Sequence, residues 1–262
     1  MLNILVCVKQ VPDVNLVKID PETGSLIRQG VPSILNPLDS NALEAAVQTK
    51  EKYGGEITCI TMGPDMAAEA LRECLAAGAD KAVLLSDRAF ANADTLATSY
   101  VICTAAKSLG DYDLIFCGKE SLDGATGQMG SQLAERFGAS QLSSVAYIEE
   151  IDEKNKTVTV RRELEKGIQT ASASYPCLFT VEKTHYHPRI PNLKSWKESR
   201  VKEITKLTSD TVPGLDKDRI GDPGSPTKVP RTYPPVTGES GQIIDLGSMD
   251  KNVEKLMEVL NG

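Results

Sequence analysis

Hydrophobic residues in the first half of the chain alternate between two periods. Four short apolar runs, nearly continuous, are typical of strands covered on both faces of a parallel sheet. These runs lie at residues 4–8, 56–62, 82–85 and 113–117. Apolar residues between and after the runs recur at helical spacing, and the expected helices begin after Asp39 or Ser40 as cap, after Pro64, at Asp94 and near Met129. This alternation predicts an α/β fold with a doubly wound, mostly parallel sheet, whose ligands lie outside the carboxyl ends of the strands.

After Gly138 the period of the pattern changes to two, which is typical of antiparallel strands. The expected strands lie at residues 143–149, 157–163, 167–174 and 178–182. Two short extended pieces nearer the N-terminus, at 17–19 and 25–27, predict a surface hairpin with its turn at 20–24. The sequence therefore predicts an antiparallel portion added to the parallel sheet.

A Pro-rich tract at residues 213–235 interrupts the pattern, and we expect no packed element across it. A short helix follows, with Ser248 as cap and one apolar face formed by Val253, Leu256, Met257 and Leu260. We expect a nucleotide-binding domain at 1–207 and an extended arm at 208–262. The arm would wrap another polypeptide, and the alternative is that it folds back on its own domain.

Composition narrows the class of function. The chain has 262 residues and a net charge of −7, which argues against a general binder of nucleic acid or of membrane surfaces. Its six cysteines form no C-x-x-C pair, so buried free thiols in a cytoplasmic protein without membrane insertion are expected. The only histidines, His185 and His187, lie in a Pro-containing loop without further metal ligands. We expect no metal site and no acid–base catalytic constellation.

The segment 118–137 predicts a strand end, a glycine-rich loop and a helix start. Gly124, Gly127 and Gly130 let the backbone approach a ligand closely, and the helix start offers unpaired N–H groups. These features suit a phosphate group. A plain strand-to-helix turn is the alternative.

A second segment of this type lies at residues 87–98. Thr95 and Thr98 hydroxyls with first-turn N–H groups could hold an anion, and Arg88 and Phe90 could contact a ring. The alternative is a capped helix with Asp94 as N-cap. Two such helix starts after neighbouring strands fit a dinucleotide with a pyrophosphate better than a mononucleotide.

Several motifs occur along the chain in a fixed order: residues 8–13 (VKQVPD), 36–37 (NP), 62–64 (MGP), 78–80 (GAD), 118–130 and 224–229 (GSPTKV). Together they resemble the β subunit of electron-transfer flavoproteins over nearly the whole chain. The resemblance implies a partner α subunit that carries FAD, and an adenine nucleotide in the β subunit itself. This nucleotide is AMP in one branch of the family and a second FAD in the electron-bifurcating branch, which residues 87–98 resemble.

The resemblance also implies a set of nucleotide-binding residues. Those around the adenosine end are Cys7, Asn36, Asp39, Met62 and residues 125–130. The full expected set is Cys7, Lys9, Asn36, Asp39, Met62, Arg88, Phe90, Asp94, Thr95, Thr98, Asp123, Gly124, Ala125, Thr126, Gly127, Gln128, Met129 and Gly130. The family commonly has Asp at the position of Ala125, so one polar contact to the nucleotide is absent or replaced.

A loop at residues 184–192 matches the family's docking loop for a partner dehydrogenase. Ile190 is its expected apolar anchor, with Pro191 and Asn192 beside it. Its His-Tyr-His portion is unusual for the family. The partner would be an acyl-CoA dehydrogenase or a flavin-dependent 2-hydroxyacid dehydrogenase.

The resemblance thus implies the β subunit of a bifurcating electron-transfer flavoprotein. Its FAD would accept a hydride from NADH and send one electron to ferredoxin or flavodoxin. The other electron would pass through the α-subunit FAD to the dehydrogenase. Arg88 is the expected residue that tunes the flavin. An AMP-binding, non-bifurcating β subunit and an ATP-binding regulatory module without flavin are the alternatives.

Overall fold

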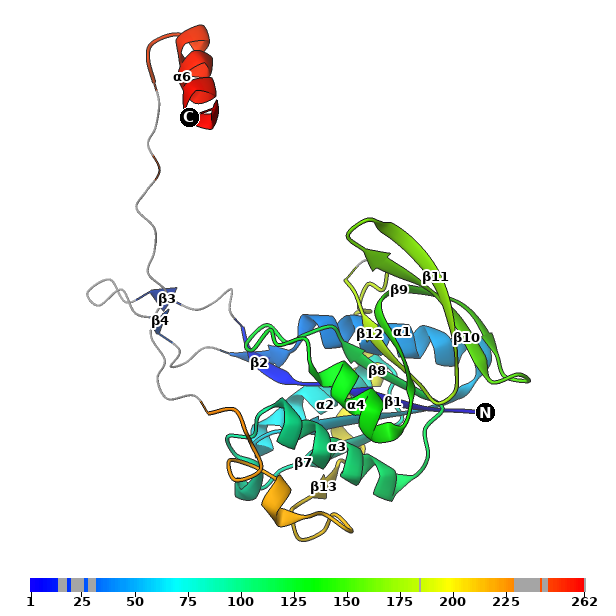
Figure 1. The fold of residues 1–262 in the computed structure, drawn as a ribbon. Helices are drawn as coiled ribbons and strands as arrows, with labels where there is room; N and C mark the ends of the chain where they lie inside the picture. Colours follow the sequence, from blue (N-terminus) through cyan, green and yellow to red (C-terminus); the bar gives the residue numbers. More distant parts are fainter. Residues whose placement is uncertain are drawn as a thin grey trace. The chain divides into compact units, whose positions relative to one another are not determined.

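The chain folds as two compact units in a computed structural model, Met1–Lys228 and Val229–Gly262 (Figure 1). The structure describes residues 1–13, 18–19, 26–27, 32–183, 185–228, 241 and 245–261. In the second unit the described element is helix α6 (Met249–Asn261). Residues 208–228, which we expected in the arm, belong to the first unit.

A nine-stranded sheet organises the first unit, in the order β11-β10-β9-β12-β8-β1-β6-β7-β13. The strands are β1 (Leu2–Cys7), β6 (Gly55–Met62), β7 (Lys81–Leu85), β8 (Leu114–Gly118), β9 (Ser140–Asp152), β10 (Thr157–Leu164), β11 (Gly167–Ser174), β12 (Cys177–Val181) and β13 (Thr205–Leu207). Neighbours from β9 to β13 pair in parallel, and β10 is antiparallel to both β9 and β11. The predicted doubly wound, mostly parallel sheet with an antiparallel portion is therefore confirmed.

Two details of the sheet differ from the prediction. Strand β12, expected at 178–182 as antiparallel, pairs in parallel with both β8 and β9. Edge strand β13 was not predicted, because three residues of mixed polarity carry no clear period. The expected hairpin is present as β3 (Lys18–Ile19) paired antiparallel with β4 (Leu26–Ile27), and its turn at 20–24 lies outside the described residues. Strands β2 (Gln10–Pro12) and β5 (Ser33–Leu35) form another small pair.

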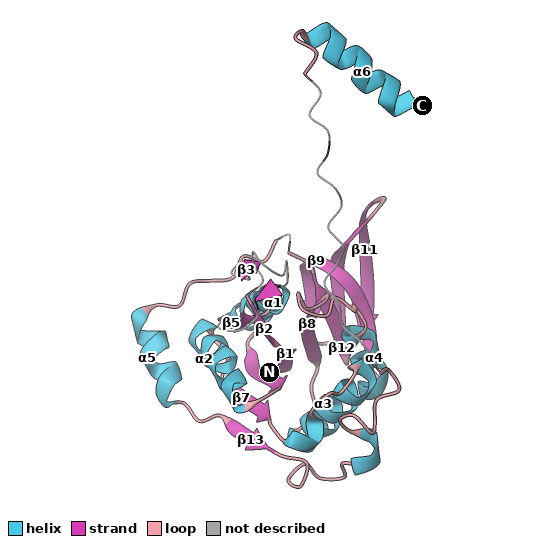
Figure 2. Ribbon diagram, turned by 90° about the vertical axis from the view of Figure 1, so that its left-hand side faces the viewer, coloured by secondary structure: helices cyan, strands magenta, loops and turns pink. Residues whose placement is uncertain are grey.

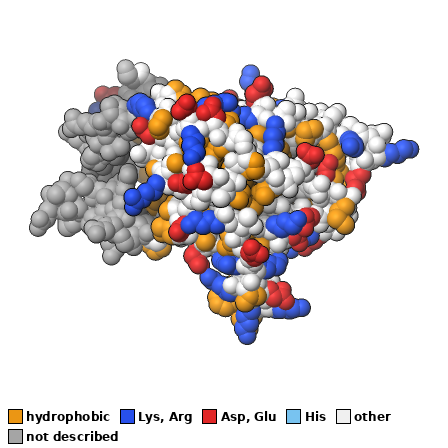
Figure 3. Space-filling model, turned by 90° about the horizontal axis from the view of Figure 1, so that it is seen from below, with side chains coloured by type: hydrophobic (Ala, Val, Ile, Leu, Met, Phe, Trp, Pro, Cys, Tyr) orange, Lys and Arg blue, Asp and Glu red, His pale blue; other side chains and the backbone are white. Residues whose placement is uncertain are grey.

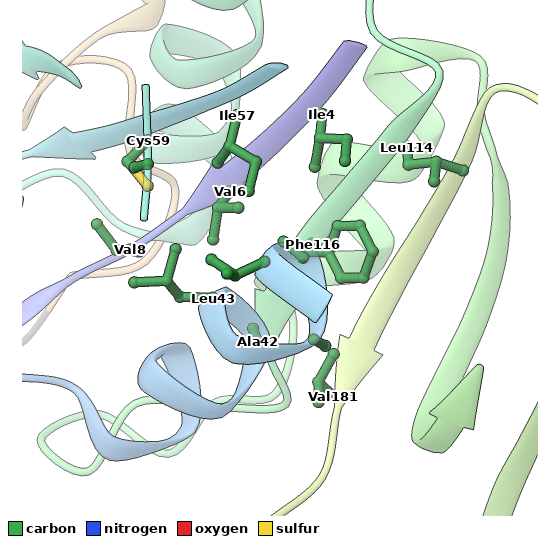
Figure 4. Close-up of a cluster of buried hydrophobic side chains, with 14 of the residues drawn as sticks. Ile4, Val6, Val8, Ala42, Leu43, Ile57, Cys59, Leu114, Phe116 and Val181 are labelled. Atoms are coloured by element: carbon green, nitrogen blue, oxygen red, sulfur yellow. The ribbon is translucent and has the colours of Figure 1, made fainter. Parts of the chain in front are cut away.

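Helices cover both faces of the sheet (Figure 2). Those of the first core are α1 (Pro37–Tyr53) and α2 (Ala68–Ala77), with α5 (Leu193–Val201) packed on α2. Those of the second core are α3 (Thr95–Leu109) and α4 (Met129–Phe137). Short 3₁₀ helices are η2 (Asp65–Ala67), η3 (Arg88–Phe90) and η4 (Lys217–Arg219). Figure 4 shows Ala42 and Leu43 of α1 among Val6, Phe116 and Val181 of three adjacent strands.

The segment after β13 packs against the second core, contrary to our expectation for the Pro-rich tract. Val212 and Ile220 are buried there, next to Phe90 and the sheet. Gly221 has a φ of +55°, and a Cβ at this position would lie 2.1 Å from the carbonyl oxygen of Ala89. The glycine therefore allows this segment to lie against the loop that follows β7.

Strand β1 has β6 on one side and β8 on the other. The chain runs from β1 through β6 to β7 in one direction, and then crosses back to β8. The order of the strands reverses between β1 and β8, and open α/β sheets bind ligands outside the carboxyl ends of the strands at such a point. Among the described residues no helix is long and apolar enough to cross a bilayer.

Candidate functional site

Asp39 of α1 joins the carboxyl ends of β1 and β8. Its carboxylate accepts hydrogen bonds from the backbone N–H of Lys9 (2.8 Å) and of Gly118 (3.0 Å). Burial raises the pKa of Asp39 to about 7, although both N–H bonds act to lower it. A Cβ at Gly118 would lie 2.6 Å from the carboxylate, so only glycine fits there. Asp39 is thus a structural clamp beneath the site, and neither it nor Ser40 caps α1 as we expected.

The loop after β8 is held by Asn36 and Lys9. Asn36 donates from Nδ2 to the carbonyl of Glu120 (2.9 Å) and accepts from Leu122 N–H (3.2 Å). The ammonium group of Lys9 forms an ion pair with Asp123 at 2.7 Å. These three predicted residues therefore meet at the switch point, where they position the glycine-rich loop.

The glycines of the 118–137 segment have different roles. Gly127 has a φ of +61° and open space where a Cβ would stand, and Gly124 is also exposed. Both leave room for a ligand. Gly130 is buried, and a Cβ there would lie 2.3 Å from Thr180 Cγ2 of β12. The lack of a side chain at Gly130 therefore serves the packing of α4 on the sheet, and a backbone contact from Gly130 to a ligand stays a prediction.

Asp94 caps α3, as the alternative prediction had it. Its Oδ1 accepts from Ala97 N–H and its Oδ2 from Thr227 N–H, each at 3.0 Å. Its own N–H donates to Ser225 Oγ at 2.8 Å. The carboxylate thus ties the start of α3 to the 208–228 segment. Partial burial acts to raise the pKa of Asp94, but the bonds from Ala97 and Thr227 together hold it below the usual range.

The starts of α3 and α4 are connected by side chains. Thr95 Oγ1 donates to Gln128 Oε1 at 2.8 Å, and Gln132 Nε2 donates to Thr95 Oγ1 at 3.2 Å. The Thr98 hydroxyl has no hydrogen-bond partner within the described part of the chain. Gln132 was not among the predicted residues, although its position four residues after Gln128 places both amides on one side of α4.

Arg88 and Phe90 of η3 have opposite environments. Arg88 is exposed and has no carboxylate partner among the described residues. Phe90 is only 5% exposed and lies in the second core, so the expectation that it is free to contact a ring is wrong.

Two further predicted residues, Cys7 and Met62, lie against the core. Cys7 is buried, which raises the pKa of its thiol well above the usual value. Met62 is half-buried against the second core.

The predicted docking loop is fixed on both sides of its exposed part. The buried Tyr186 accepts from Ile148 N–H at its hydroxyl (2.9 Å). Arg189 forms ion pairs with Glu44 (2.8 Å) and Glu51 (2.6 Å) of α1. Ile190 between them and the next helix is 94% exposed, and Asn192 caps α5 through Ser195 N–H. A rigid loop that presents an exposed isoleucine is suited to a protein contact.

The arrangement at the switch point fits an anionic ligand. Exposed residues of the glycine-rich loop offer backbone N–H groups, and the Thr98 hydroxyl and Arg88, both without a side-chain partner among the described residues, are further donors. No group of three or more His, Cys, Asp or Glu residues suited to a metal ion occurs in the described ranges. A cavity of about 350 Å³ lies elsewhere, between the docking loop, α1, α2 and α5, and none of the predicted nucleotide-binding residues lines it.

Comparison with known proteins identifies the family. A family model described as "Electron transfer flavoprotein domain" matches residues 23–212. The electron transfer flavoprotein subunit beta of Thermoanaerobacterium thermosaccharolyticum is 45% identical over 261 residues, which cover 99% of this chain and 98% of the relative. The caffeyl-CoA reductase-Etf complex subunit CarD of Acetobacterium woodii is 45% identical over 244 residues (93% and 92%). Protein FixA of Bradyrhizobium diazoefficiens is 40% identical over 262 residues (98% and 90%). The chain therefore belongs to the electron transfer flavoprotein family, as a β subunit.

Proposed function

We propose that this chain is the β subunit of an electron-bifurcating electron transfer flavoprotein and that its own nucleotide is FAD. Family membership implies an α subunit and a dehydrogenase as partners. The observation that carries the proposal is the Thr95–Gln128 hydrogen bond, which holds the starts of α3 and α4 side by side. One ligand with a pyrophosphate can then use the N–H groups of both helices, whereas a monophosphate needs only one.

Some residues of the chain would contact the nucleotide directly, and others would hold the contacting loop in place. Residues 123–129 and the first turn of α3 would donate to the phosphates, and the Thr98 hydroxyl would add a further donor. Lys9, Asn36 and Asp39 would act indirectly, because their bonds fix the loop that meets the ligand. FAD in this position would supply oxidation of NADH by two electrons and their release one at a time to two acceptors.

Arg88 would tune the flavin. It is the cation of η3, follows the strand next to β6 and has no carboxylate partner in the described ranges. A positive charge beside a flavin favours its reduced, anionic form. Arg88→Ala should therefore retain FAD and lower the potential of that FAD in a redox titration. An unchanged potential would remove this role from Arg88.

An AMP-binding, non-bifurcating β subunit is the second candidate. Two observations favour it: Asp94 is fully used as a helix cap, and Phe90 is buried instead of facing the expected flavin position. Both leave fewer contacts for the flavin half of FAD than the sequence predicted.

The partner proteins follow from the same proposal. The acceptors would be ferredoxin or flavodoxin and, through the α-subunit FAD, a flavin-dependent dehydrogenase of the acyl-CoA or 2-hydroxyacid type. One relative is named as a subunit of a caffeyl-CoA reductase complex, which favours a CoA-ester partner. We place the complex in the cytoplasm.

An electron-balance assay tests the function. The purified heterodimer with its dehydrogenase is given NADH, oxidised ferredoxin and the dehydrogenase's electron acceptor. Bifurcation predicts that ferredoxin is reduced only while the second acceptor is also present. Ferredoxin reduction that is independent of the second acceptor, or absent altogether, would contradict the proposal.

A further inference from the structure

Three cations converge on a cavity of about 500 Å³ at the outer side of α3, α4 and the segment around η4. Lys107, Arg136 and Arg219 line it together with Tyr100, Thr104 and Ser108. Among the described residues its lining contains no Asp or Glu. This is unexpected in a chain with 36 acidic and 29 basic residues. Acidic and basic side chains are intermixed on the face drawn in Figure 3, so a cavity whose charged lining residues are all cations is a local feature.

The charges of these cations are not neutralised. In the part of the chain that the structure describes, none of the three forms an ion pair. Lys107 Nζ donates to the carbonyl of Arg136 (2.7 Å), and Arg136 donates to Ser99 Oγ and to a backbone carbonyl (2.9 and 3.0 Å). These acceptors are neutral, so the side chains are held in place while their positive charge stays available to a partner.

Tyr100 holds two of the cations close together. The guanidinium of Arg219 lies 4.1 Å from the centre of its ring, and that of Arg136 lies 5.4 Å from it. The Tyr100 hydroxyl accepts from Asp216 N–H at 2.9 Å, which ties η4 to α3. Two like charges on one ring repel each other, and an anionic partner would relieve this repulsion.

We propose that this cationic cavity is the docking surface for the acidic electron-carrier protein of the proposed function. The inference rests on that function for the identity of the partner. Because both guanidiniums engage Tyr100, the cavity offers charge rather than a free ring for stacking a base, which suits protein carboxylates. The lining residues of α3 follow Thr95 by five to thirteen residues, roughly 7.5 to 20 Å along the helix axis. The near end of the cavity, at Tyr100, is therefore the part of this surface closest to the predicted nucleotide site.

Charge reversal in the purified heterodimer tests the surface. Lys107→Glu, Arg219→Glu and the double variant are compared with Lys166→Glu, which makes the same charge change in the exposed turn between β10 and β11. Isothermal titration calorimetry measures the Kd for a purified, oxidised ferredoxin at low and at moderate salt. FAD content and heterodimer mass are measured on the same samples.

We expect each cavity variant to raise the Kd roughly tenfold and the double variant to raise it further, with a weaker dependence on salt. Lys166→Glu should bind as the wild type does. An unchanged Kd in both cavity variants, or an equal rise in Kd for Lys166→Glu, would overturn the proposed docking role of the cavity. Loss of the heterodimer would also overturn it, since the cations would then face the α subunit. If the wild type binds neither ferredoxin nor flavodoxin, the acceptor in the proposed function fails and the surface fails with it.

Discussion

The hydroxyl of Thr95 donates a 2.8 Å hydrogen bond to Gln128 Oε1, and so links the first residue of α3 to the residue that precedes α4. Gln132 donates to the same hydroxyl from one turn further along α4. Helix N-termini carry partial positive charge, which the Asp94 carboxylate offsets at α3, whereas α4 has no side-chain cap. An anionic ligand at the start of α4 would supply the charge that is absent there.

Thr95→Val should lower both the stability of the subunit and its affinity for the nucleotide. The change removes two hydrogen bonds between α3 and α4, which together contribute about 1–2 kcal/mol to the free energy of unfolding. We expect a lower melting temperature and loss of nucleotide during gel filtration of the heterodimer. Thr98→Val is the matched control, because its hydroxyl has no partner within the described part of the chain. Thr98→Val should release nucleotide without lowering the stability of the nucleotide-free protein. Full retention of nucleotide by both variants would contradict a nucleotide site at the start of α3.

Gly130→Ala should destabilise the packing of α4 on β12. The new Cβ would lie 2.3 Å from Thr180 Cγ2, a methyl group that is buried and cannot move away easily. We expect a loss of about 2–3 kcal/mol in chemical denaturation. Adding Thr180→Ser removes this methyl group and keeps the hydroxyl that accepts from Ser144 N–H. The double variant should recover most of the loss, and a loss that stays the same would show that Gly130 has another role.

Asp39 should make stability depend on pH. Burial raises its pKa in the folded chain from 3.8 to about 7, so between these values the folded state holds a proton that the unfolded state has lost. Its contribution to stability is therefore present below about pH 4, falls as the pH rises and is lost above about pH 7.

Comparison with Asp39→Asn isolates this contribution. The difference in unfolding free energy, wild type minus variant, should fall by about 2 kcal/mol between pH 5 and pH 7 and then level off. Urea denaturation of the nucleotide-free heterodimer at several pH values measures it. A difference that is constant, or that grows with pH, would mean that the two N–H bonds keep the carboxylate ionised.

Ile190→Ala should weaken coupling to the dehydrogenase. The side chain is 94% exposed on a loop that Tyr186 and Arg189 hold in place, so its removal alters a contact and not the fold. We expect a several-fold higher KM for the dehydrogenase in electron transfer, with unchanged flavin content. Val201→Ala on α5, 85% exposed, is the control and should have no effect. Loss of flavin from Ile190→Ala would refute the docking role.

Most of the fold could be predicted because its buried strands and helices have clear periods. The pairing of strand β12 was predicted wrongly, since a run of five buried residues at 177–181, four of them apolar, fits a parallel strand as well as an antiparallel one. Helix α5 was missed because its sequence is mostly polar, and it is held by tertiary contacts such as Arg72 donating to the carbonyl of Ser199. Pattern alone cannot reveal such contacts.

The site could be predicted in part for a similar reason. The position of Asn36, Lys9 and Asp123 at one sheet edge follows from the order of the strands. Whether a glycine or an aromatic residue faces a ligand or the core depends on packing across the sheet. Gly130 and Phe90 face the core, because Thr180 and the 208–228 segment lie against them.

The nucleotide content of the purified heterodimer tests the central proposal most directly. The complex is denatured, and the released FAD and AMP are separated and counted against protein. We predict two FAD and no AMP per heterodimer, one FAD in each subunit. One FAD with one AMP would contradict a bifurcating flavin in this subunit.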